Sequence, residues 1–169
     1  MGINFSNGTT LSTGSTGKIL QIVHAHKSDR QTFSTSSGTY SDVSGMSATI
    51  TPSSTSNKII IMFNINTGGQ SGQRITYRLQ RNGNNIARGD SDGSSQRGCF
   101  SSIVTSGNSQ SEHQSYVFRD SPSSTSALTY KIQFESEGGT HIINNTRGGD
   151  GGSTYHVGSS NIMLMEEQG

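Results

Sequence analysis

Two stretches of this chain, PSSTSNKIIIMFNI at residues 52–65 and PSSTSALTYKIQFE at residues 122–135, decide the fold class. Each begins with the polar segment PSSTS and continues into a run with strand character. Pro52 and Pro122 are the only prolines in the sequence. Proline has a fixed φ and no backbone N–H, and serines and threonines can hydrogen-bond their own backbone in turns. We interpret each PSSTS as a corner between strands, at equivalent places in two halves of a sandwich; chance similarity in a serine-rich chain is the alternative.

The rest of the sequence predicts further short strands joined by Ser, Gly and Asn turns. Ile75, Tyr77 and Leu79 alternate with polar residues, as in a strand with one wet face. The Asn82-Gly83 pair that follows is typical of a tight hairpin turn. About ten strands are predicted in all, at residues 18–27, 31–37, 40–51, 59–63, 75–80, 86–88, 99–105, 113–119, 128–135, 141–145 and 161–166. Regular short strands without a helical period predict an all-β fold, an antiparallel β-sandwich that is jelly-roll-like.

Two of these strands carry more specific expectations. In YSDVSGMSATIT, Met46 and Ala48 are out of phase with Val43, and a bulge at Gly45 would absorb the slip. The run IIIMF at residues 59–63 is continuously apolar, which predicts a central strand covered on both faces.

The composition predicts a folded domain with a thin core. The chain has 15 Ile, 5 Leu, 5 Val and 6 Phe in 169 residues, and its formal net charge is only +1. Low net charge and clustered apolar residues argue against disorder. Because so few large side chains are available to offset the ordering entropy, we expect burial between subunits, and hence a homo-oligomer.

Several classes of protein are disfavoured. The single Cys99 cannot form an intrachain disulfide, and we expect it to be a half-buried residue beside Phe100. The opening MGINFSNGTT lacks the basic and apolar regions of a signal peptide, and no apolar run is long enough to span a membrane. Near-neutral charge without a basic cluster argues against nucleic-acid binding.

Metal binding has two weak candidates. His24 and His26 would share one face of a strand, but no third ligand is identifiable, so two exposed histidines are favoured unless a symmetry axis gathers several chains. Asp90 and Asp92 resemble the start of a calcium loop without its closing acid, and a solvated turn is favoured. No cofactor is predicted.

Four segments together resemble a known family: GKILQIV, YSDVSGMSATITPSSTSNKIII, DSPSSTSALTYKIQFES and SNIMLMEE. They are similar to a β-sandwich domain common in structural proteins of tailed bacteriophages, and the resemblance covers about residues 17–167. Such domains occur in tail fibres and resemble trimeric jelly-roll decoration proteins of heads. The resemblance implies a virion component, assembled in the bacterial host cytoplasm, that is not an enzyme. It transfers no catalytic residue.

Two functions follow as hypotheses. The first is a head decoration, or cement, protein that stabilises the capsid as a trimer bound to the phage major capsid protein. Residues 18–169 would form the sandwich, and residues 1–17 an extended arm with Ile3, Phe5 and Leu11 as apolar anchors. The alternative is a tail-fibre or receptor-binding module, attached to tail proteins, that recognises host surface glycan through the loops at residues 68–73, 90–98 and 148–153. A glycan-degrading enzyme ranks last, because Glu135 and Glu137 lack an opposing acid.

Overall fold

The structure is a computed structural model that describes residues 3–4, 10–11, 17–34, 36–70, 72–103, 110–146 and 156–169. All regular elements in these residues are β-strands, and they contain no helix that could cross a membrane. The strands are β1 (Ile3–Asn4), β2 (Thr10–Leu11), β3 (Ile19–Lys27), β4 (Gln31–Phe33), β5 (Ser41–Ile50), β6 (Lys58–Gly69), β7 (Arg74–Arg81), β8 (Asn84–Ile86), β9 (Phe100–Ile103), β10 (Ser111–Asp120), β11 (Leu128–Ser136), β12 (His141–Ile143) and β13 (Ser160–Glu167).

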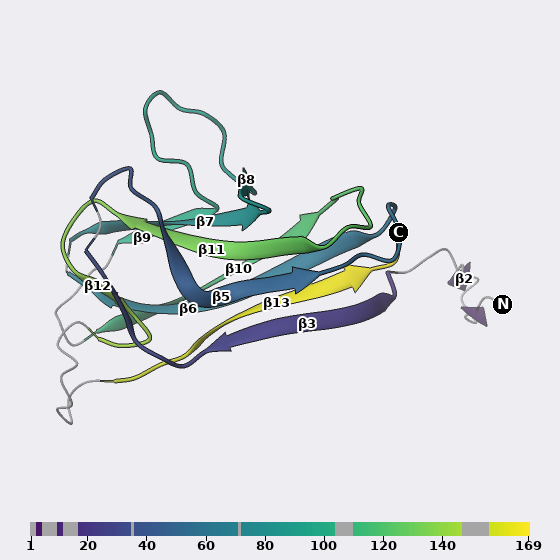
Figure 1. The fold of residues 1–169 in the computed structure, drawn as a ribbon, viewed down its shortest axis with the longest axis horizontal. Helices are drawn as coiled ribbons and strands as arrows, with labels where there is room; N and C mark the ends of the chain where they lie inside the picture. Colours follow the sequence, from purple (N-terminus) through teal and green to yellow (C-terminus); the bar gives the residue numbers. More distant parts are fainter. Residues whose placement is uncertain are drawn as a thin grey trace.

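The strands from β3 onward form two antiparallel sheets that pack face to face (Figure 1). In the first sheet, β10 pairs with one edge of β6 along almost the whole length of β6. The other edge of β6 pairs first with β13 and then with β12. Beyond them, β3 pairs with β13 and β4 with β12. In the second sheet, β11 lies between β5 and β7, and β8 and β9 share the far edge of β7. Each sheet is therefore four strands wide.

The strand order is that of a jelly roll. Counting β3/β4, β8/β9 and β12/β13 as one strand each gives eight strands in chain order. The strand order is then 1-8-3-6 in the first sheet and 2-7-4-5 in the second. This is the order of a jelly roll, in which the chain repeatedly crosses from one sheet to the other. The predicted all-β, jelly-roll-like sandwich is confirmed. Each of the eleven predicted strand ranges overlaps one of the strands β3 to β13, whereas β1 and β2 lie in the segment that was predicted to be an extended arm.

Both PSSTS segments lie at corners between the sheets, as the sequence predicts. The first joins β5 to β6, and the second joins β10 to β11. Ile50 pairs with Leu128 in one sheet, and Ile59 pairs with Asp120 in the other. The two connections therefore span the same gap and lie at the end of the sandwich that carries the C-terminus (Figure 1).

The two corners differ in how they are held. Glu166 of β13 is 1% exposed, and its Oε1 accepts hydrogen bonds from the Ser53 backbone N–H at 2.6 Å and from Asn57 Nδ2 at 2.5 Å. The Ser53 hydroxyl donates to the same oxygen at 2.8 Å, and Gln21 Nε2 donates to Oε2 at 2.6 Å. In the second corner the Ser126 N–H donates to the neighbouring Ser124 hydroxyl at 3.0 Å. Among the described residues, a buried carboxylate therefore holds the first corner and none holds the second.

Alternation of apolar residues builds the core between the sheets. Ile75, Tyr77 and Leu79 of β7 are fully buried, as predicted. Positive φ angles at Asn82 (48°) and Gly83 (81°) form the predicted hairpin turn between β7 and β8. The remaining core side chains come from both sheets, and the fully or almost fully buried aromatic ones are Phe33, Phe63, Tyr130 and Phe134.

The predicted bulge in β5 is confirmed. Gly45 has φ 78°, and the register between β5 and β11 shifts at this point. Both Val43 and Met46 are therefore buried, although they are out of phase in the sequence.

One expectation about the core is wrong. The run at residues 59–63 was predicted to be covered on both faces, but β6 alternates: Ile59, Ile61 and Phe63 are fully buried, whereas Met62 is 38% exposed. The strand is central within its sheet, but none of the residues that the structure describes covers Met62 on the outer face of that sheet.

Candidate interaction surface

Apolar side chains occupy the outer face of the first sheet across all four of its strands. Residues directly opposite one another on paired strands share a face. Met163 lies opposite both His24 and Met62, and Met62 lies opposite Val117. In the neighbouring row, Met165 lies opposite Ile22 and Ile60. We call this set the apolar face: Leu20, Ile22, Ile60, Met62, Val117, Met163 and Met165.

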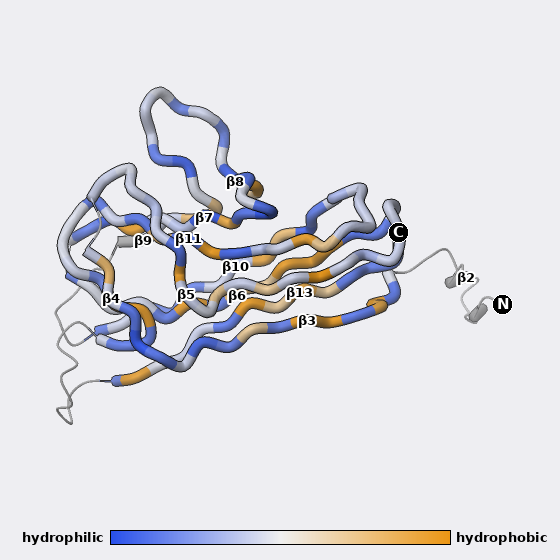
Figure 2. Tube along the Cα trace, viewed as in Figure 1, coloured by the Kyte–Doolittle hydropathy of each residue, from blue (hydrophilic) through white to orange (hydrophobic). Residues whose placement is uncertain are grey.

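The apolar face is open to solvent in the single chain. Ile22 and Val117 are each 58% exposed, Leu20 is 40% exposed and Met62 38%. Figure 2 shows hydrophobic residues along β3, β13 and β6 of this sheet. Single exposed apolar residues are normal, but a contiguous set over four strands is typical of an interaction site.

Polar groups border the apolar face. The next row beyond Met163 holds His26, Asn161, Asn64 and Ser115. On β10, Arg119 lies opposite Ile60, in the same row as Met165 and Ile22, and it pairs with Glu167 of β13. An apolar centre with a polar rim is the usual anatomy of a protein–protein interface.

The outer face of the second sheet has the opposite character. Lys131 and Gln133 of β11 each donate to Asp42 of β5 at 2.8 Å, and the Arg78 guanidinium lies 3.4 Å from the centre of the Tyr40 ring. Residues 87–99 form a loop that stands on this side of the sandwich and is mostly hydrophilic (Figure 2). The two broad faces are therefore chemically distinct, and only the first is apolar.

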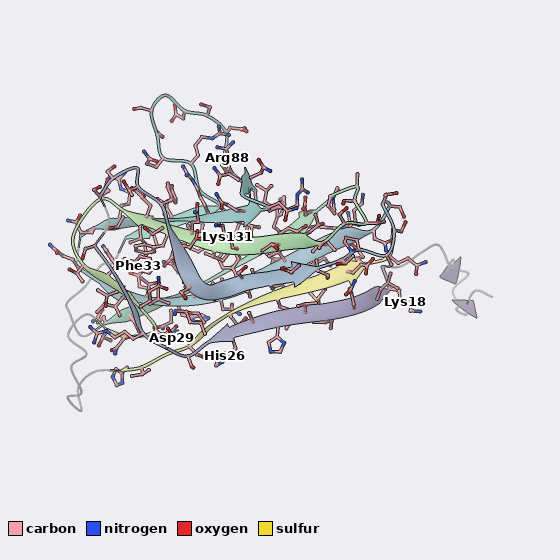
Figure 3. All side chains as sticks on the ribbon, in the orientation of Figure 1. Lys18, His26, Asp29, Phe33, Arg88 and Lys131 are labelled. Atoms are coloured by element: carbon pink, nitrogen blue, oxygen red, sulfur yellow. The ribbon has the colours of Figure 1, made fainter. Side chains whose placement is uncertain are left out.

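The structure does not bring the predicted metal candidates together. His24 and His26 are exposed on β3, and Figure 3 shows His26 projecting from β3 at the margin of the first sheet. Asp90 and Asp92 are exposed in the loop on the second sheet. Within the residues that the structure describes, no three His, Cys, Asp or Glu side chains gather in a group that could hold a metal ion.

The proposed anchors of the N-terminal arm fall largely outside what the structure describes. Ile3 and Leu11 pair with one another between β1 and β2, so part of the predicted extended arm forms a two-stranded ladder. Phe5 lies outside the described residues, as does the predicted glycan-contacting loop at residues 148–153.

Cys99 is half-buried beside the core, as predicted. Its Sγ lies 3.2 Å from the Tyr77 carbonyl oxygen, and burial raises the pKa of the thiol to about 12. A thiol with so high a pKa is a poor nucleophile at neutral pH, because the thiolate is the reactive form.

No protein-family model matches the chain, and no curated protein is similar to it at a significant level. The surfaces of the molecule therefore carry the functional inference. The apolar face was missed in the sequence because IIIMF was interpreted as a fully covered strand. One pattern in the sequence could have revealed the apolar face. Three strands carry apolar residues in the phase opposite to their core residues, namely Ile22, Ile60, Met62, Met163 and Met165.

Proposed function

We propose that this protein is a non-enzymatic structural component of a bacteriophage virion, a capsid decoration protein that forms a homotrimer and stabilises the head. The apolar face is the observation that supports it most directly, because a protein that assembles into a larger particle needs such a surface. The jelly-roll sandwich and the sequence resemblance to phage structural domains agree with this function.

A second copy of the chain is the proposed occupant of the apolar face. Complete burial of a Val, Ile or Met side chain contributes roughly 1.5–3 kcal/mol. Covering the exposed parts of Val117, Ile22 and Met62 would then contribute roughly 3 kcal/mol per subunit. The side chains of the apolar face carry no formal charge, and the neighbouring Arg119 is paired with Glu167, so little net charge opposes the approach of a second copy.

The proposal also assigns a role in assembly to the N-terminal arm at residues 1–17. Residues 1–17 would reach the major capsid protein or a neighbouring copy, with Ile3, Phe5 and Leu11 as anchors. Deleting this arm is expected to leave a folded oligomer that no longer joins particles. Normal incorporation of the truncated chain would contradict the role of the arm.

Oligomerisation can be tested with two matched substitutions at exposed valines. Val117 lies on the apolar face, whereas Val157, which is 75% exposed, lies outside it. Val117→Asp would force a carboxylate to lose its water against apolar neighbours, so we expect size-exclusion chromatography with light scattering to show monomers. Val157→Asp should remain a trimer. A monomeric unsubstituted chain, or a trimeric Val117→Asp variant, would refute the proposed interface.

Location is tested by immunogold labelling of intact virions with an antibody against this chain. Label spread over the heads is expected for a decoration protein. Label confined to tail tips would instead favour the alternative, a tail-fibre module that recognises host surface glycan. Absence of label from every particle would refute the virion assignment itself.

A further inference from the structure

A polar groove lies on the outer side of the second sheet, on the broad face opposite the apolar face. It has a volume of about 160 Å³ and lies beside the loop at residues 87–99, which Figure 1 shows standing above β7 and β9. Hydroxyl, amide and charged side chains line it: Ser37, Arg74, Thr76, Ser95, Gln96, Ser101, Glu135 and Glu137. A second hollow of about 140 Å³ shares Thr76, Ser95, Gln96 and Ser101 and adds Gly89, Asp90, Arg97, Gly98 and Phe100.

Three adjacent strands supply the floor of the groove. Glu135 of β11 lies opposite Thr76 of β7, and Thr76 lies opposite Ser101 of β9. Glu135 is 2% exposed and Thr76 is 6% exposed, so both are held by the sheet around them. The Gly38 backbone N–H donates to Glu135 Oε1 at 2.9 Å, which fixes the carboxylate on the floor. These groups are therefore presented at fixed spacing on a rigid surface.

The loop that forms the wall is braced by its own hydrogen bonds. The Gly89 N–H donates to the Gly98 carbonyl oxygen at 3.3 Å, and Arg97 Nε donates to the Gly89 carbonyl oxygen at 2.8 Å. Arg78 Nε, from β7, donates to the Arg97 carbonyl oxygen at 3.2 Å and ties the loop to the sheet. A wall organised before binding reduces the entropy lost when a ligand is bound.

The charges of the groove restrict the kind of ligand. Arg74 pairs with Glu137 at 3.2 Å on the rim, and Glu135 lies on the floor. One guanidinium and two carboxylates give the lining a formal charge of −1. Phosphate, sulfate and acidic sugars would be repelled, whereas a neutral ligand rich in hydroxyl groups would find both donors and acceptors.

We propose that this groove binds a neutral sugar residue. Sugar hydroxyls both donate and accept hydrogen bonds, which matches carboxylates that accept, a guanidinium that donates, and hydroxyl and amide groups that do both. Ser95 and Gln96 belong to the loop at residues 90–98, so the proposal gives the glycan recognition of the alternative function a specific site, and it does not depend on the capsid role. Because the groove is on the opposite broad face, covering the apolar face of a chain does not itself cover that chain's groove. An array of such chains would bind a polysaccharide by multivalency even if each groove is weak.

The test uses amide spectra of the full-length, isotope-labelled protein titrated with the methyl glycosides of glucose, galactose, mannose and N-acetylglucosamine. At least one glycoside should cause saturable shifts at the amides of Thr76, Gln96 and Ser101. Gln96→Ala should bind about tenfold more weakly, as loss of one hydrogen bond predicts. Gln133→Ala is the matched control, because Gln133 lies on the same outer face but does not line the groove, and it should bind normally.

Three results would overturn the proposal. The first is the absence of saturable shifts with all four glycosides. The second is unchanged binding by Gln96→Ala when its spectrum shows a native fold. The third is that calcium chloride, and no glycoside, shifts the groove amides, which would identify a cation site on the two carboxylates. Light scattering on the same samples reports the oligomeric state separately, so failure of the proposed trimer would be distinguished from failure of sugar binding.

Discussion

The buried carboxylate of Glu166 should make the stability of this protein depend on pH. Burial alone would raise the pKa of Glu166, but the hydrogen bonds from Asn57, Gln21 and Ser53 outweigh it and lower the pKa from 4.5 to about 2. A folded-state pKa below the unfolded value stabilises the fold above that unfolded value. This contribution is therefore complete above about pH 4.5 and is lost as the pH falls towards 2.

The size of the effect follows from the lowered pKa. One pKa unit corresponds to roughly 1.4 kcal/mol, so lowering the pKa of Glu166 from 4.5 to about 2 contributes roughly 3 kcal/mol at neutral pH. Glu166→Gln keeps the shape of the side chain but places an amide NH₂ group among donors. We expect this variant to be about 2–3 kcal/mol less stable at neutral pH, with the difference shrinking to a small value near pH 2.

Urea unfolding followed by circular dichroism, at one fixed protein concentration, measures these differences. The two PSSTS corners provide a matched control pair. Ser53→Ala removes a hydroxyl that donates to Glu166 and should cost about 1 kcal/mol. Ser123→Ala, at the same place in the second corner, should change stability by less than about 0.5 kcal/mol. A Glu166→Gln deficit that is as large near pH 2 as at neutral pH would refute the reasoning.

Three further predictions concern single side chains. Because its pKa is raised from 9.0 to about 12, Cys99 should react with iodoacetamide about a thousandfold more slowly in the folded protein than after unfolding, as mass spectrometry would show. Asp120→Asn should cost roughly 1–3 kcal/mol in urea unfolding, because Asp120 accepts from Arg81 at 2.6 Å and from the buried Tyr130 hydroxyl at 2.7 Å. Gly45→Ala should cost at least about 1 kcal/mol in the same assay, because φ is 78° at the bulge, where alanine is strained.

Local sequence patterns predicted the fold class well. Period-two alternation in β7, the Asn82-Gly83 turn, the bulge at Gly45 and the two proline corners each depend on the conformational preferences of a few neighbouring residues. Such preferences act wherever the segment lies, so they can be inferred without knowing the rest of the molecule.

The candidate surfaces could not be predicted in the same way. The carboxylate that holds the first corner comes from Glu166, 113 residues away from Ser53 in the chain. The groove takes its floor from β7, β9 and β11, and its other lining residues come from the β4–β5, β8–β9 and β11–β12 connections. No local pattern marks these residues, because only the pairing of distant strands brings them together.

The sequence by itself determined that the chain forms short antiparallel strands with one apolar phase each, since alternation and turn chemistry are properties of neighbouring residues. Only the tertiary structure decided which sides of those strands are covered. The run at residues 59–63 is apolar on both sides, yet the jelly roll covers Ile61 and leaves Met62 open. Burial depends on what packs against a face, and that is decided by contacts between residues far apart in the sequence.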